Sequence, residues 1–314
     1  MKAIVCKKYG APENLEIVEY KNPTPNDNEV LIKIYATSVT DSDIFIRSSN
    51  VPLRMLIPFR LMIGILKPRN EILGEVFSGV IEKIGTRIKR FKVGDQVYGI
   101  TGMSLGAYAE YKCMKEIDSK KGCIAIKPGN ISFEEATAAA YGGLLAFQFL
   151  EERNIQPNQK VLIYGASGTS GTIAIQYAKH LGAEVTGVCS AKNIEFIKSL
   201  GADKTLDYTK RESISKLEVY DFILDAVGKR KTSQLKDACK QSLKNGGKYV
   251  SIDDSALICS SERLNRINEL VESKKITPIN DRCYPFEQII DAHRFVELGH
   301  KKGGVEITVK NSNM

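Results

Sequence analysis

The sequence has few histidines, no tryptophan and no closely paired cysteines. Three histidines occur in 314 residues, at positions 180, 293 and 300, and none has the spacing of a metal-binding motif. The seven cysteines form no C-x-x-C pair. Their odd number and scattered positions, without a signal peptide, are typical of reduced thiols in a cytoplasmic protein. These absences argue against a structural zinc cluster and against a histidine-based metal site.

Long apolar runs and compact basic patches are also missing. No uncharged apolar run reaches the roughly 18 residues of a membrane-spanning helix, so no membrane span is predicted. The net charge is +8, but the basic residues are spread along the chain. A generally basic protein therefore explains the charge better than nucleic-acid binding. The remaining composition, 43% apolar and 26% charged, is that of a globular protein, and the length suits about two domains.

The most informative stretch is residues 160–207. Four apolar residues at 161–164 predict a buried parallel strand, and a glycine-rich turn follows it. Apolar residues between positions 173 and 181 then predict a helix that packs on a sheet. A second apolar strand at 183–189 completes a βαβ unit. A G-x-x-G-x-x-G run also occurs in unrelated α/β loops, but this context favours a dinucleotide-binding turn.

Each glycine of this turn has an expected role. Gly165 permits the tight turn, Gly168 lets the backbone approach a pyrophosphate, and Gly171 lets helix and strand pack closely. The N–H groups that open the helix would bind the phosphates, helped by the positive end of the helix dipole. The candidate phosphate-binding residues are Gly165, Ser167, Gly168, Thr169, Ser170 and Gly171.

The end of the second strand predicts which dinucleotide binds. An Asp or Glu there would accept a hydrogen bond from the ribose of NAD. The chain instead has Ser190-Ala191-Lys192-Asn193, with no acid. Ser190 and Lys192 suit a 2′-phosphate, so the sequence favours NADPH over NADH. The alternative for Lys192 is an ordinary solvated lysine at the start of a helix.

Two regions of different pattern flank this stretch. Short strands separated by glycine and proline turns fill residues 1–113, which predicts a closed or folded antiparallel β domain. From a capping box at Ser132–Glu135 onward, strands alternate with helices, which predicts a doubly wound parallel sheet. The expected strands are 160–164, 184–189, 204–208, 221–227 and 248–252, and the expected helices include 192–200, 232–243, 262–273 and 286–298.

Residues 51–70 are apolar but carry four basic residues and no acidic residue. Three prolines and Gly64 interrupt the segment, so little regular helix is expected there. We expect a lid or wall over a substrate cleft. An interfacial membrane segment is the alternative.

Motifs along nearly the whole chain resemble the medium-chain dehydrogenase/reductase superfamily. They include the nucleotide-binding turn and the sequences at residues 74–82, 94–99, 106–111, 200–203, 225–228 and 299–304. The resemblance implies a GroES-like β-rich catalytic domain formed by residues 1–125 with 263–314. It also implies a Rossmann domain, with a doubly wound parallel sheet, at residues 126–262. The fold class is therefore α/β, and the most similar branch is that of zinc-free quinone oxidoreductases that use NADPH.

The zinc-dependent branch has metal ligands at positions that correspond here to Thr40, Glu75 and Tyr141. Zinc prefers thiolate and imidazole ligands, so this set is a poor zinc site. The resemblance therefore implies hydride transfer from NADPH to a quinone or conjugated enone, with no metal ligands. Thr40 or Tyr141 would donate a hydrogen bond to the substrate oxygen.

The resemblance also places other residues at the cofactor. Tyr208 corresponds to a tyrosine beside the adenosine, and Val227 and Gly228 lie where the nicotinamide is expected. We expect an Asp43–Arg47 ion pair, and we expect His293 and His300 at the surface or at helix ends. A shortened segment at 253–262 leaves the family's homodimer in doubt here. Three other functions remain open: an enoyl-thioester C=C reductase, a zinc-type alcohol dehydrogenase and a nucleotide-binding protein without turnover.

Overall fold

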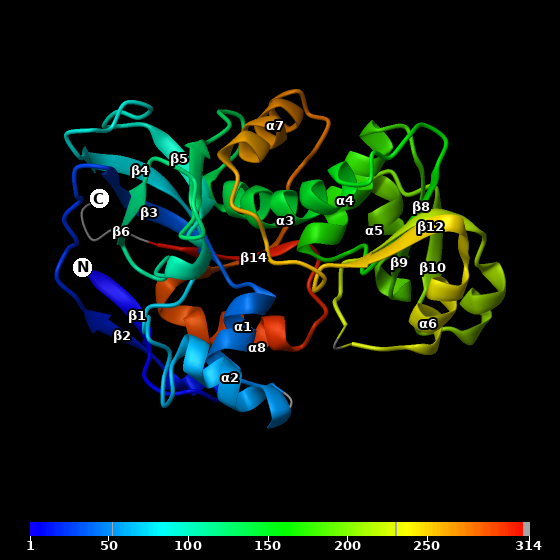
Figure 1. Cartoon of the computed structure of the whole chain (residues 1–314), viewed down its shortest axis with the longest axis horizontal. Coiled ribbons are helices and arrows are strands. Elements are labelled where there is room, and N and C mark those ends of the chain that lie inside the picture. The colour runs from blue at the N-terminus through cyan, green and yellow to red at the C-terminus, as the bar shows by residue number, and fades with distance from the viewer. Residues whose placement is uncertain (52, 230, 310–314) are drawn as a thin grey trace. The chain divides into compact units, whose positions relative to one another are not determined.

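The computed structural model describes residues 1–51, 53–229 and 231–309, and the chain forms two compact units (Figure 1). The first unit contains Met1–Ala140, Cys259–Asn268 and Asn280–Met314, and the second contains Tyr141–Ile258 and Glu269–Ile279. The chain thus leaves the first unit, forms the second and returns twice. The finer prediction, with domain boundaries at residues 126 and 262, stays a prediction.

The first unit is built on a β-sheet with the strand order β13-β14-β3-β4-β5-β7, and β6 pairs with β3. Its core contains apolar side chains that alternate along the strands, including Ile32 and Ile34. β1 and β2 form a separate antiparallel pair. This β-rich unit confirms the GroES-like part of the predicted fold class. The strands are β1 (Lys2–Cys6), β2 (Leu15–Glu19), β3 (Glu29–Ser38), β4 (Val76–Ile84), β5 (Gln96–Ile100), β6 (Tyr111–Lys115), β7 (Cys123–Ile126), β13 (Asn280–Pro285) and β14 (Gly304–Thr308).

The helices of the first unit flank this sheet. The predicted capping box before α3 is confirmed, because Ser132 Oγ accepts from the Glu135 amide at 3.1 Å and Glu135 Oε2 accepts from the Ser132 amide at 2.8 Å. Both α3 and α7 run from one unit into the other. The helices are α1 (Asp41–Ser48), α2 (Leu53–Ile63), α3 (Phe133–Glu151), α7 (Ser261–Glu272) and α8 (Ile289–Glu297), with 3-10 turns at Pro12–Asn14, Gly102–Ser104 and Phe286–Gln288.

The expectation of little regular helix in residues 51–70 is wrong, because α2 continues through Pro58. A proline removes one backbone N–H from a helix, but packing compensates for that loss here. The Phe59 ring contacts the Phe45 ring of α1 edge to face, with 5.0 Å between ring centroids. The helix then ends before Gly64, whose φ of +142° is one that other residues rarely adopt.

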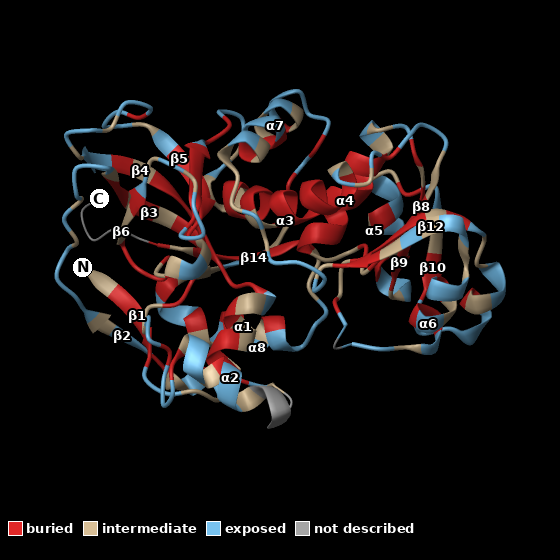
Figure 2. Cartoon of the chain, viewed as in Figure 1, coloured by how far each residue is buried: buried red, intermediate tan, exposed pale blue. Residues whose placement is uncertain are grey.

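The second unit contains a parallel sheet with the strand order β10-β9-β8-β11-β12. Its central strand, β8, begins and ends at the predicted residues. Most residues of β8 and of its two neighbours, β9 and β11, are buried (Figure 2). The order reverses beside β8, which confirms the predicted doubly wound, Rossmann-like sheet. The strands are β8 (Lys160–Tyr164), β9 (Glu184–Cys189), β10 (Lys204–Asp207), β11 (Tyr220–Asp225) and β12 (Leu243–Ser251); the helices are α4 (Thr169–His180), α5 (Ile194–Ser199) and α6 (Gln234–Gln241), with 3-10 turns at Ala191–Asn193 and Arg211–Lys216.

Candidate dinucleotide-binding site

The glycine turn joins β8 to α4, and packing within the second unit requires two of its glycines. Gly165 has a φ of +82°, and a Cβ on it would stand 2.4 Å from Cγ2 of Val227. A Cβ on Gly171 would stand 2.3 Å from the carbonyl oxygen of Gly165. Both contacts are too short for a real side chain. These two glycines are therefore needed for the turn itself, as the sequence pattern predicted.

Gly168 differs from the other two glycines because the fold does not require it. Its backbone is extended, with a φ of −80°, and a Cβ would meet only the Gly165 carbonyl oxygen at an ordinary 3.5 Å. Gly168 is the N-cap of α4 and supplies no side-chain acceptor to the first helical turn. Apart from this carbonyl oxygen and the chain neighbours of Gly168, no heavy atom lies within 4 Å of that Cβ position, so the space beside this N-cap is open. Such a space at a helix start suits a phosphate group.

The residues after β9 lie beside this turn. Ser190 is half-buried and is the N-cap residue of the short 3-10 turn after the strand, and Lys192 is exposed within that turn. Asn193 is buried and donates from Nδ2 to Ser167 Oγ at 3.1 Å. Among the described residues, the Oδ1 atom of Asn193 is buried without a hydrogen-bond partner. A buried acceptor of this kind usually has a partner, which a bound ligand or water would supply.

Asn193 is a residue to which sequence reasoning gave no role. Its position in the run from Ser190 was visible, but nothing in the sequence indicated that its side chain reaches back to Ser167. Tyr208, which follows β10, is 39% exposed, and its amide donates to the Cys189 carbonyl at 3.1 Å. The adenosine-side candidates therefore come from the carboxyl ends of neighbouring strands.

Val227 and Gly228 follow β11 at the same edge of the sheet. Asp225 Oδ1 accepts from their amides at 3.1 and 3.2 Å. Cγ2 of Val227 fills the space in which a Cβ of residue 165 would lie. The predicted glycine turn and the predicted nicotinamide-side residues thus lie together at the carboxyl ends of β8, β9 and β11. In open α/β sheets, ligands bind at this edge where the strand order reverses.

Tyr141 lies on α3, next to the start of α4. A Cβ on its neighbour Gly142 would stand 2.6 Å from the Thr169 carbonyl oxygen, so the two helices are in close contact there. Tyr141 is half-buried. Its predicted role as a donor to the substrate stays a prediction.

Thr40, in the first unit, is buried as the N-cap of α1. Its Oγ1 accepts from the Asp43 amide at 3.1 Å and donates to Asp43 Oδ2 at 2.7 Å. The structure therefore accounts for Thr40 as a helix cap. Donation to a substrate would require this hydroxyl hydrogen to turn away from Asp43, and that role also stays a prediction.

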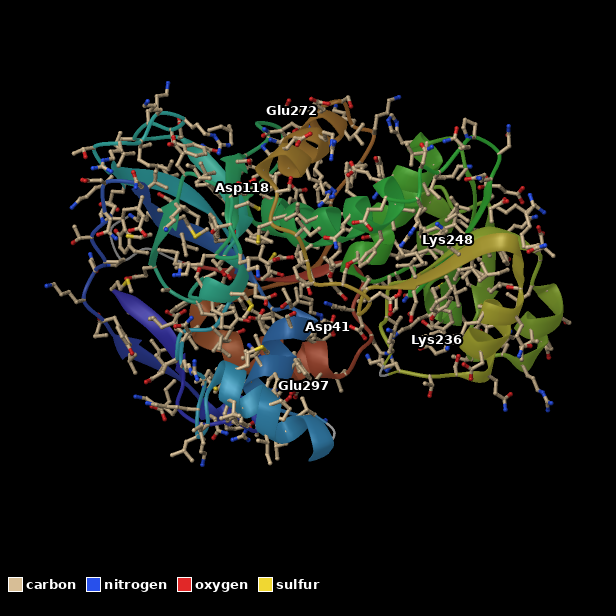
Figure 3. All side chains as sticks on the ribbon, viewed as in Figure 1. Asp41, Asp118, Lys236, Lys248, Glu272 and Glu297 are labelled. Atoms are coloured by element: carbon tan, nitrogen blue, oxygen red, sulfur yellow. The ribbon has the colours of Figure 1, made fainter. Side chains whose placement is uncertain are left out.

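The expected Asp43–Arg47 ion pair is wrong. Asp43 accepts from Thr40 and from the Gly74 amide at 3.0 Å, whereas Arg47 pairs with Glu297 at the end of α8, which Figure 3 labels. Arg47 is fully buried and also donates to the Gly10 carbonyl. A side chain of this length reaches past its own helix, so an i, i+4 spacing did not determine its partner.

His293 is buried in the middle of α8, so its expected place at the surface or at a helix end is wrong, whereas His300 is exposed as expected. The Nδ1 atom of His293 accepts from Arg47 Nε at 3.3 Å, and Nε2 lies 3.2 Å from the Tyr108 hydroxyl. Burial, together with the positive charge of Arg47, lowers the pKa of His293 to about 3. The imidazole is therefore neutral at physiological pH.

The carboxyl groups of Asp43 and Glu75 have raised pKa values. Burial raises the pKa of Asp43 to about 6, against the effect of the hydrogen bonds that it accepts. Burial and the nearby charge of Asp43 raise the pKa of Glu75 to about 8. Glu75 is therefore largely protonated at neutral pH.

The positions that correspond to zinc ligands do not fit zinc. Thr40 is hydrogen-bonded to Asp43, and Glu75 has a raised pKa, so neither offers the anionic or imidazole donor that zinc prefers. In the described part of the chain, no group of three or more His, Cys, Asp or Glu side chains is arranged to hold a metal ion.

Comparisons with known proteins agree with this arrangement. A family model described as "Alcohol dehydrogenase GroES-like domain" matches residues 26–128, and two models described as "Zinc-binding dehydrogenase" match residues 171–255 and 253–305. The chain is 30% identical to the NAD(P)H oxidoreductase RTN4IP1, mitochondrial, of Bos taurus, over 98% of this chain and 89% of that protein. It is 27% identical to the NADPH-dependent alkenal/one oxidoreductase, chloroplastic, of Arabidopsis thaliana, over 98% and 79%.

A solved structure extends the likeness to the whole fold. The quinone oxidoreductase from Coxiella burnetii superposes with a TM-score of 0.83, at 25% identity, over 99% of each chain. The matching families, the relative at 30% identity and this structure cover both units of the fold. The chain therefore belongs to the medium-chain dehydrogenase/reductase superfamily, in its quinone oxidoreductase-like branch.

Proposed function

We propose that the chain is an NADPH-dependent oxidoreductase that passes a hydride to a quinone or a conjugated enone without zinc. The observation that carries this proposal is the open space beside Gly168, the N-cap of α4. Family membership supports an oxidoreductase that uses a nicotinamide cofactor. The name of the Arabidopsis relative supports NADPH and an enone substrate.

The residues of the second unit fit a dinucleotide. The turn Gly165–Gly171 would hold the pyrophosphate, and the unpartnered Oδ1 of Asn193 would accept from the cofactor or from a water bound with it. Ser190 and Lys192 would bind the 2′-phosphate, since a lysine near a phosphate forms a charge-assisted hydrogen bond. Tyr208 would lie by the adenosine, and Val227 and Gly228 would flank the nicotinamide.

When bound, NADPH supplies the hydride, and the chain supplies orientation and hydrogen bonds. Asp225 holds the amides of Val227 and Gly228, which fixes the edge of the sheet at which the ring would lie. Hydride addition to an enone leaves negative charge on the carbonyl oxygen. We propose that the hydroxyl of Tyr141 or of Thr40 donates a hydrogen bond to that oxygen.

The substrate class is tested by steady-state kinetics. We expect the purified protein to oxidise NADPH in the presence of a benzoquinone or a conjugated enone, at least tenfold faster than with an enoyl thioester. A metal chelator should leave these rates unchanged, because the zinc-ligand positions hold no suitable donors. A faster rate with the thioester would favour the C=C reductase. Stoichiometric zinc with alcohol oxidation would contradict the proposal, and tight NADPH binding without turnover would leave only a binding protein.

Cofactor preference is tested at Lys192. We expect Lys192→Glu to lower kcat/KM for NADPH by tenfold or more and to leave kcat/KM for NADH nearly unchanged, because only NADPH carries the 2′-phosphate. Lys216→Glu is the matched control, since this exposed lysine ends the 3-10 turn that precedes β11, toward the amino ends of the strands. Equal losses for both cofactors, or equal losses in both variants, would show that Lys192 is a solvated lysine.

Three further predictions accompany this proposal. The catalytic and nucleotide-binding domains are expected to divide at residues 126 and 262, and the protein is expected in the cytoplasm. A homodimer is expected only if another surface replaces the shortened segment at 253–262. An oligomeric-state measurement tests the homodimer, and localisation in cells tests the cytoplasmic location.

A further inference from the structure

The outward side of α2 and of the turn after it is apolar. Five large apolar side chains there are between 57% and 82% exposed: Ile57, Leu61, Met62, Ile65 and Leu66. Pro58 is exposed between them. Figure 2 shows this helix at an edge of the first unit with exposed residues along it. A surface helix normally turns its polar residues to water, so an exposed apolar side of this size is unusual. We call these five residues the α2 patch.

The α2 patch is held in place from behind. Phe59 points inward and packs on Phe45, while the Arg60 guanidinium lies 3.9 Å from the centroid of the Tyr9 ring. Arg60 also donates to Ser49 Oγ at 2.9 Å and to the Ile65 carbonyl at 2.7 Å. These contacts fix the helix and the turn. The apolar side chains are therefore exposed by the packing of the segment and not by fraying of its ends.

Cations surround the α2 patch. The described cationic side chains of this segment are Arg60, Lys67 and Arg69, and residues 51–70 contain no acidic residue. Arg69 lies at the patch itself, because it donates to the Leu61 carbonyl at 2.6 Å. The exposed Lys8 precedes Tyr9, whose hydroxyl donates to the Gly64 carbonyl at 2.7 Å. The nearest acid in sequence, Glu71, is paired with Lys67 at 2.6 Å.

This combination selects one kind of partner. An apolar centre with a cationic rim matches a bilayer surface, where acyl chains lie beneath anionic headgroups. A second copy of the chain would bring two cationic rims together, which is unfavourable. With 11 residues, α2 is about 16 Å long, against about 30 Å for the hydrocarbon core, so it can lie in the interface only. In the described residues, no helix is long and apolar enough to cross a membrane.

We propose that the α2 patch docks the protein on anionic phospholipid surfaces. Ile57, Leu61 and Leu66 enter the boundary between headgroups and acyl chains, and Arg69 and Lys8 contact the headgroup phosphates. Docking of this kind is reversible and weakens as salt screens the cationic rim. The inference does not depend on the proposed oxidoreductase activity, because it uses the surface of the first unit alone.

Vesicle flotation tests the proposal with the full chain. The probes are vesicles of phosphatidylcholine alone and vesicles of phosphatidylcholine mixed with phosphatidylglycerol. We expect the protein to float with the mixed vesicles at low salt, and at least tenfold less with neutral vesicles or at high salt. Leu66→Asp and Leu61→Ser should each lower binding to the mixed vesicles about tenfold or more, and Arg69→Glu should lower it further at low salt.

The matched control is Ile117→Asp, since Ile117 is also a highly exposed apolar residue of the first unit but lies outside the α2 patch. It should bind the mixed vesicles like the unchanged protein. Thermal melting should show that every variant is folded. Absence of binding to the mixed vesicles would overturn the proposal. So would equal losses at Leu66 and Ile117, or a dimer in solution that Leu66→Asp dissociates, which would identify a second copy as the partner.

Discussion

Replacement of Gly168 by aspartate is expected to lower NADPH affinity at least 100-fold and to leave the chain folded. Gly168 has an extended backbone that any residue adopts, and a Cβ there meets only the Gly165 carbonyl oxygen at 3.5 Å. An aspartate is also a favourable N-cap for α4, because its carboxylate accepts from the first-turn amides. The same carboxylate would occupy the amides proposed to bind the pyrophosphate and would repel it. A 100-fold loss corresponds to about 2.7 kcal/mol of binding free energy.

The measurement is a fluorescence titration of NADPH, with thermal melting of the same samples. Gly171→Ala is the matched control, because its Cβ would clash at 2.3 Å with the Gly165 carbonyl oxygen. We expect that variant to lose thermal stability, whereas Gly168→Asp should melt at or above the temperature of the unchanged protein. If Gly168→Asp bound NADPH normally, the turn would not be the cofactor site and the proposed function would lose its main support.

The sequence predicted the nucleotide-binding sheet well because the relevant signals are local. Continuous apolar runs flanked by glycine identify buried parallel strands, and β8 and β9 begin and end at the predicted residues. The capping box at Ser132 needs only residues three positions apart. The need for glycine at position 171 was predictable because a strand and the helix that follows it must pack closely there.

Contacts between residues far apart in sequence were not predictable in this way. Arg47 meets His293 and Glu297, which are about 250 positions away, and only the register of the first unit brings them together. The i, i+4 rule suggested Asp43 instead, since local spacing carries no information on distant partners. Asn193 was missed for the same reason, because its contact with Ser167 joins two different loops.

The helix through Pro58 illustrates a third limit. A proline argues against a helix when only backbone hydrogen bonds are considered. The sequence alone does not show how much the packing of side chains stabilises the helix. Packing of Phe59 on Phe45 adds the missing stabilisation. The same packing turns Leu61 and Met62 outward, so the error about the helix also concealed the α2 patch.

The second large effect is expected at Lys236, a buried residue of α6 that Figure 3 labels in the second unit. Its Nζ pairs with Asp225 Oδ2 at 2.6 Å and donates to the Gly228 carbonyl at 2.6 Å. Lys236→Met should lower the free energy of unfolding by about 3–5 kcal/mol, because Asp225 would remain buried without its charge partner. The measurement is urea denaturation followed by circular dichroism.

The double variant Asp225→Asn with Lys236→Met separates loss of the pair from loss of packing. It leaves no isolated charge, so it should recover part of the stability that Lys236→Met loses. The Tyr249 hydroxyl, which donates to Asp225 Oδ2 at 2.8 Å, can still donate to the asparagine oxygen. Both variants should bind NADPH more weakly, because Asp225 holds the Val227 amide and Lys236 holds the Gly228 carbonyl. A stable Lys236→Met variant with normal affinity would show that neither residue positions the carboxyl edge of the sheet.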